Sequence, residues 1–162
     1  MDNPLASALA LAFLGMIIGL IVYYRRNRFV KSYIALKNRY NDLKNPAFIE
    51  ELIKLVDKFK NRQSLEELEE IGNIFYETAN YKLSAKYYSE YIYDEEFKKG
   101  DNKDESYYMI FIKCALSDKY SGNGQKAIKK LKSIDSIFPC DIIELNDFYY
   151  QVKAIVDSDI EY

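Results

Sequence analysis

The sequence contains no histidine and only two cysteines. Without histidine the chain lacks the commonest general base, the usual pH switch and the commonest metal ligand. Cys114 and Cys140 do not form a Cys-x-x-Cys motif. Cys114 lies among the apolar residues of segment 109–116, where a free thiol packs as a small hydrophobe. We therefore expect no metal site and no cofactor.

Patterns for catalysis and for nucleic-acid binding are also missing. The carboxylates of segment 66–70 are typical of an exposed helix face, and the glycine-containing turn at 121–124 has no Walker lysine. The 162-residue chain carries a formal charge of −2 and has a pI of about 5.4. Phosphate binding needs a basic surface. The sequence therefore predicts neither an enzyme nor a nucleic-acid-binding protein.

A long apolar run follows the N-terminus. The twenty residues 5–24 carry no charge, and at about 1.5 Å rise per residue they match a hydrocarbon core of roughly 30 Å. A cleaved signal peptide would have positive charge before this run, where only Asp2 stands. Gly15 and Gly19 form a Gly-x-x-x-Gly spacing, which allows two such helices to approach as a homo-oligomer. We expect residues 1–24 to be a tail and one transmembrane helix.

Basic residues follow the apolar run. Because positive charge stays on the cytoplasmic side, they predict that the rest of the chain faces the cytoplasm, across an inner or cell membrane if the source is bacterial. A periplasmic location is the alternative. The same residues could rest on anionic lipid headgroups or only fix the topology. Residues 25–44 are assigned as a basic juxtamembrane helix, whose lipid-facing residues are Arg25, Arg26, Arg28 and Lys31.

Apolar residues recur at helical spacing from Phe29 almost to the end of the chain, and no strand pattern competes. Pro46 suits the first turn of a helix. Ser64 and Glu67 have the spacing of a capping box. The fold class is all-α, with a helical domain over residues 45–162. The expected helices are 29–40, 46–59, 65 to a turn at 79–80, 81 to about 92, about 107–119, about 125–137, and 141–157.

Two further signals concern helix boundaries. The charged stretch 94–106 contains a glycine and predicts an exposed loop. Asp141, with Glu144 three residues later, predicts the cap of the last helix. The apolar positions of that helix would seal the end of a helical stack.

Segment 71–92 pairs a small and an aromatic residue on one helix with small and aromatic residues on the next. The residues concerned are Ile71, Gly72, Phe75, Ala79, Tyr81, Ser84, Tyr88 and Ile92. They resemble the tetratricopeptide repeat pattern. Gly72 and Ser84 would let the two helices cross closely while large rings fill the gap beside them. The departures are Tyr91, where the family has alanine, and Glu96, where it usually has proline.

A second copy of this pattern follows. The turn positions Ala79 and Gly122 are 43 residues apart, against the usual 34 of the repeat, and the charged stretch accounts for the difference. Asp118 stands where an aromatic residue is expected. The resemblance implies a short α-solenoid with repeats at about 65–96 and 107–139 and a capping helix at about 141–157. The second copy is carried by Phe111, Cys114, Ala115, Gly122, Ala127, Leu131, Ile134 and Pro139.

The resemblance also implies a concave groove lined by the first helix of each repeat. Asn73 stands where chaperone-binding members place an asparagine that holds a terminal carboxylate, but Glu69 replaces their lysine. An acidic tail is therefore disfavoured, and a basic amphipathic helix suits the groove better. A solvated acidic helix face is the alternative. The groove residues implied are Glu66, Glu69, Asn73, Tyr76, Glu77, Met109, Ile112, Leu116 and Tyr120.

Two non-catalytic functions are consistent with these features. The first is a membrane-anchored adaptor or receptor that binds a segment of a partner protein in the groove. The second is a structural scaffold subunit of a large bacterial envelope assembly, such as a flagellar-motor accessory (collar) complex. An adaptor should use the groove, whereas a scaffold subunit should use a lateral protein interface.

Overall fold

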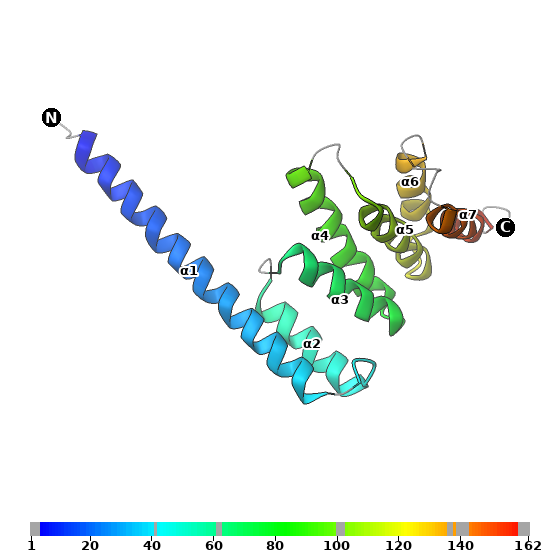
Figure 1. Ribbon diagram of the computed structural model, residues 1–162, viewed down its shortest axis with the longest axis horizontal. Helices are drawn as coiled ribbons and strands as arrows, with labels where there is room; N and C mark the ends of the chain where they lie inside the picture. The colour runs from blue at the N-terminus through cyan, green and yellow to red at the C-terminus, as the bar shows by residue number, and fades with distance from the viewer. Residues whose placement is uncertain are drawn as a thin grey trace. The chain divides into compact units, whose positions relative to one another are not determined.

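The computed structural model describes residues 4–40, 42–60, 63–99, 103–135, 138 and 143–158. Among these residues every regular element is an α-helix, which confirms the predicted all-α class (Figure 1). The chain divides into two compact units, Met1–Gln63 and Ser64–Tyr162. The helices are α1 (Pro4–Arg39), α2 (Pro46–Lys58), α3 (Leu65–Glu77), α4 (Tyr81–Lys99), α5 (Glu105–Tyr120), α6 (Gly124–Ile134) and α7 (Ile143–Asp157).

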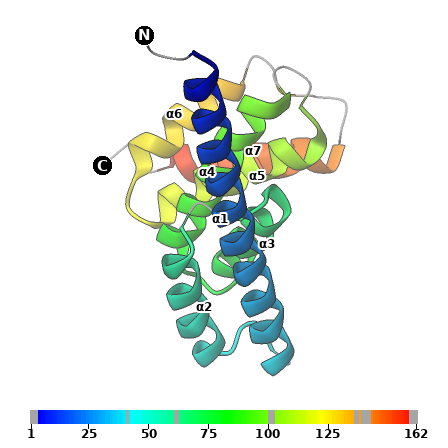
Figure 2. The same cartoon turned by 90° about the vertical axis from the view of Figure 1, so that its left-hand side faces the viewer.

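The first unit is a pair of helices, in which α2 packs along the C-terminal part of α1 (Figure 2). Asn45 caps α2, because its side chain accepts a hydrogen bond from the amide of Ala47 at 2.9 Å, and Pro46 occupies the first turn as expected. The ring centroids of Phe29 and Phe59 lie 5.9 Å apart. Buried side chains of both helices form a small core: Phe29, Tyr33, Leu36, Phe48, Ile49, Leu52, Val56 and Phe59.

The predicted transmembrane helix is not supported. In the part of the chain that the structure describes, no helix is both long enough and apolar enough to cross a membrane. Residues 5–24 do lie in one helix with exposed apolar side chains from Leu9 onward, but the side chains of residues 5–7 and 10 lie outside the described part. The single-pass membrane location is therefore corrected. The lipid-facing role of Arg25, Arg26, Arg28 and Lys31, which are exposed on α1, depended on that span and is withdrawn with it.

The second unit stacks its helices in chain order. Helix α3 packs on α4, α4 on α5, and α5 on α6; α7 packs on both α5 and α6, and α3 also reaches α5. Ser64 caps α3 through the predicted capping box, in which its backbone amide donates to Glu67 at 2.6 Å and its hydroxyl accepts from the Glu67 amide. Asp104 caps α5 by accepting from the Tyr107 amide at 3.0 Å.

Several of the predicted boundaries differ from the structure. The stretch 94–106 was expected to be a loop, but α4 continues to Lys99 and α5 begins at Glu105. A charged sequence is compatible with an exposed helix as well as with a loop. Helix α6 ends at Ile134 and α7 begins at Ile143. The expected contributions of Pro139 and Asp141 lie outside the described residues.

The two hairpins of this unit turn in the same way. Ala79 and Gly122 both have a positive φ, of 58° and 86°. The amide of Asn80 donates to Phe75 O at 2.8 Å, and the amide of Asn123 donates to Asp118 O at 2.8 Å. The backbone bonds that start the second helices, Ser84 to Asn80 and Ala127 to Asn123, also correspond. The α3–α4 and α5–α6 turns thus repeat the same hydrogen bonds 43 residues apart.

Candidate functional site

Side chains of α3 and α5 meet on one side of the second unit. The Lys113 ammonium group donates to Asn73 Oδ1 at 2.9 Å, and the Tyr88 hydroxyl of α4 donates to the same oxygen at 2.7 Å. Lys113 also lies over the Tyr76 ring, 6.0 Å from its centroid. These contacts fix the first helix of the one hairpin to the first helix of the next.

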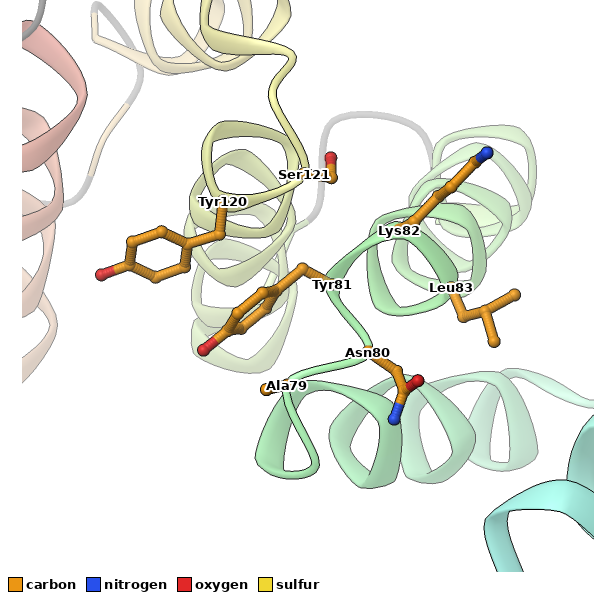
Figure 3. A pocket seen from close by; sticks show the side chains of 7 residues that line it. All are labelled: Ala79, Asn80, Tyr81, Lys82, Leu83, Tyr120 and Ser121. Atoms are coloured by element: carbon orange, nitrogen blue, oxygen red, sulfur yellow. The ribbon is translucent and has the colours of Figure 1, made fainter. Parts of the chain in front are cut away.

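Three tyrosines continue this surface, and we call Tyr76, Tyr81 and Tyr120 the tyrosine shelf. The ring centroids of Tyr76 and Tyr81 are 5.9 Å apart, and those of Tyr81 and Tyr120 are 4.8 Å apart. Figure 3 shows the rings of Tyr81 and Tyr120 side by side, with their hydroxyl ends pointing the same way. Tyr88 packs behind Tyr76 with a centroid distance of 6.4 Å. The buried ring of Tyr88 therefore packs against one end of the shelf. Tyr120 forms the other end and is 49% exposed.

A shallow pocket of about 250 Å³ adjoins the shelf (Figure 3). It lies where the α3–α4 turn meets the C-terminal end of α5, so two helix ends and the start of α4 meet there. Its lining residues are Ala79, Asn80, Tyr81, Lys82, Leu83, Tyr120 and Ser121.

The electrostatics of the surface follow from partial burial. Burial lowers the pKa of Lys113 below its ordinary value, although Glu69 and Glu77 oppose that change. Burial is also the main cause that raises the pKa of Tyr76, and the phenol groups of Tyr120 and Tyr81 add to it. The surface thus combines aromatic rings, one half-buried ammonium group and carboxylates.

The structure separates the predicted groove residues into two groups. Asn73, Tyr76 and Met109 are partly exposed, and Glu69 is too, while Tyr120 lies at the edge. Glu66 and Glu77 are exposed on α3. Ile112 and Leu116 are buried and belong to the core of the unit. Of the predicted apolar and aromatic groove residues, Tyr76, Met109 and Tyr120 therefore remain at least partly exposed, whereas Ile112 and Leu116 do not.

The predicted repeat-packing residues lie where α3 crosses α4 and where α5 crosses α6. The Ser84 hydroxyl donates to Gly72 O at 3.1 Å, and the Ser117 hydroxyl donates to Ser84 Oγ at 3.2 Å. Ala79 and Gly122 lie in the exposed turns, and Tyr81 joins the shelf. The buried members are Ile71, Gly72, Phe75, Ser84, Tyr88, Ala127 and Leu131.

Sequence reasoning missed two residues of this surface. Lys113 belongs to no motif, and its counterpart 43 residues earlier is Glu70, so the repeat pattern offered no signal for it. Tyr81 was assigned to packing only. Its position directly after the turn, in a chain with sixteen tyrosines, was the signal available.

No family model matches this chain. No curated protein and no solved structure matches it either.

Proposed function

We propose that the protein is an interaction adaptor whose second unit is a short tetratricopeptide-like solenoid. In this proposal α3–α4 and α5–α6 are two repeats and α7 is the capping helix. A segment of a partner protein binds on the face formed by α3 and α5. No catalytic role is part of the proposal.

The observation that carries the proposal is the pair of matching hairpins. The same turn hydrogen bonds recur 43 residues apart, and the first helices of the two hairpins are linked through Lys113 and Asn73. Stacked hairpins of this kind present an extended face on which side chains from successive repeats contact one ligand. Tyr76 and Tyr120, one from each first helix, supply the rigid aromatic area that concentrates binding energy at protein interfaces.

A comparison of two surface variants tests the adaptor role. Tyr76→Ala/Tyr120→Ala removes two rings of the tyrosine shelf, and Lys86→Glu/Glu90→Lys reverses an ion pair of 3.9 Å on the outer face of α4. The whole chain, tagged and expressed in its source cells, is crosslinked and recovered, and partners are quantified by mass spectrometry. We expect the shelf variant to lose the partners that the wild type recovers, and the α4 variant to keep them.

Circular dichroism melting shows whether both variants fold before capture is compared. If the shelf variant keeps its partners and the α4 variant loses them, the adaptor role is wrong. A scaffold subunit with a lateral interface is then the better description.

A further inference from the structure

We propose that the tyrosine shelf binds an arginine side chain, presented by a basic segment of the partner protein. This inference rests on the proposed function and names the chemistry of the ligand. It concerns the half-exposed ring of Tyr120, the partly buried ring of Tyr81 beside it, and the pocket that both residues line.

The shelf already shows that its rings accept a cation. The Lys113 ammonium group lies over Tyr76 and is held there by Asn73. The neighbouring rings of Tyr81 and Tyr120 have no such internal cation among the described contacts, and Tyr120 is half exposed. A ring face attracts a cation placed within about 6 Å of its centroid. Tyr81 and Tyr120 can therefore do for a partner what Tyr76 does for Lys113.

The charges around the shelf favour a basic ligand. Helix α3 carries five glutamates and no basic residue. Glu69 and Glu77 both act on the neighbouring Lys113, which places negative charge beside the shelf. The pocket also adjoins the C-terminal ends of α3 and α5, where the helix dipole is negative. Lys82, the start of α4 and Lys113 carry positive charge and oppose this field.

The shape of the pocket distinguishes arginine from lysine. The two rings lie side by side (Figure 3), and both residues line the shallow pocket. A planar, weakly hydrated guanidinium group stacks on such rings. Its outer N–H groups remain able to donate hydrogen bonds to carboxylates and backbone carbonyls. A lysine ammonium group is compact and strongly hydrated, so it gains less from an open aromatic surface.

Binding of short model peptides to the whole chain tests the inference. The probes are helical peptides that differ only in two central residues, which are arginine, lysine or glutamate. Isothermal titration calorimetry gives the affinity, and NMR shifts of ring protons locate the contact. We expect the arginine peptide to bind most tightly and the glutamate peptide not to bind measurably.

Matched tyrosine variants then locate the site. Tyr120→Ala should weaken the arginine peptide by about two- to fivefold, as expected for an exposed cation–π contact worth about 0.5–1 kcal/mol. Tyr93→Ala, which removes a more exposed tyrosine from α4, should leave binding unchanged. Both positions are exposed enough that the folded chain should tolerate the change, and a melting curve checks this.

The inference is overturned if the arginine peptide binds no better than the lysine or the glutamate peptide, or if Tyr93→Ala weakens it as much as Tyr120→Ala. It is also overturned if no peptide binds. These outcomes leave the adaptor role standing when the shelf variant still loses its cellular partners. If the adaptor role itself is wrong, the shelf variant should keep its cellular partners although the wild-type chain still binds the arginine peptide.

Discussion

At the scale of single residues, Gly72 is where α3 packs directly against an aromatic ring of α4. A Cβ atom placed on Gly72 would lie 2.6 Å from both Cδ1 and Cε1 of the buried Tyr88 ring. The equivalent positions of the second hairpin, 43 residues later, are Ala115 and Leu131. The second hairpin thus combines a larger residue on its first helix with a smaller one on its second, which keeps the volume between the helices similar.

We expect Gly72→Ala to destabilise the protein, because the added methyl group overpacks a buried crossing at a cost of about 1–3 kcal/mol. This outweighs the roughly 1 kcal/mol by which alanine favours a helix interior. Chemical denaturation measures the change. Gly124→Ala is the control, since a Cβ there would meet its nearest neighbour at 3.8 Å.

The residues of the second hairpin suggest a double variant that should restore part of the stability lost in Gly72→Ala. Gly72→Ala/Tyr88→Leu reproduces the Ala115 and Leu131 combination and should recover part of the lost stability. This account of the crossing is contradicted if Gly72→Ala loses no stability. It is also contradicted if the double variant loses more stability than the sum of the losses of the two single variants.

At a second pair of equivalent positions, the first hairpin has two aromatic rings and the second hairpin has an ion pair. In the first hairpin Phe75 stacks on Tyr87 with a centroid distance of 5.6 Å. At the equivalent positions of the second, Asp118 is 1% exposed and pairs with Lys130 at 2.6 Å. Lys126 approaches the other carboxylate oxygen at 3.3 Å. Asp118, which stands where the repeat pattern has an aromatic residue, is therefore paired with lysine side chains. Burying a carboxylate without such a partner would be costly.

At the scale of helices, α7 is held to the end of α6 by a polar contact at its surface. The Tyr149 hydroxyl donates to Asp135, the C-cap of α6, and Lys153 donates to both oxygens of the same carboxylate at 2.9 Å. Burial first, and this hydrogen bond second, raise the pKa of Tyr149 to about 12. The Asp135 contact therefore favours the neutral phenol.

This raised pKa predicts an alkaline pH dependence. Tyrosine in an unfolded chain has a pKa near 10, so the contribution of Tyr149 is complete below about pH 10 and is lost as the pH rises toward 12. We expect the melting temperature of Tyr149→Phe to fall less steeply than that of the wild type over this range. Tyr150→Phe, at an exposed neighbouring position, should follow the wild type. Parallel curves for Tyr149→Phe and the wild type would refute the role assigned to the hydroxyl.

Helix positions were largely predictable because they depend on local signals. The capping box at Ser64 and the proline at the start of α2 were read correctly. The loop expected from residue 94 was wrong for 94–99, since a charged sequence is compatible with an exposed helix as well as with a loop. A run of charged residues indicates exposure to solvent. It does not by itself distinguish an exposed helix from a loop.

At the scale of the whole molecule, the chain consists of two units that each have their own buried side chains. We expect a fragment of residues 64–162 to fold alone and to melt cooperatively, within about 5 °C of the whole chain's transition for this unit. The reason is that α3–α7 bury their apolar faces against one another. Circular dichroism melting measures this.

A shorter fragment is the control for the same prediction. A fragment of residues 81–162 lacks α3 and exposes Tyr87 and Tyr88, which otherwise pack against Phe75 and Tyr76. It should melt at lower temperature and with less cooperativity. A fragment of residues 64–162 without a cooperative transition would show that the second unit depends on the first.

The sequence by itself determined the helical class, most helix starts and the pairing of small with large residues at Gly72, because periodicity, caps and residue size act between near neighbours. Only the tertiary structure decided which of the predicted groove side chains are exposed. Ile112 and Leu116 are buried while Tyr81 and Lys113 come to the surface. Burial at such positions depends on which helices pack against them. Neither the contact between Lys113 and Asn73 nor that between Tyr81 and Tyr120 exists until α3, α4 and α5 are stacked.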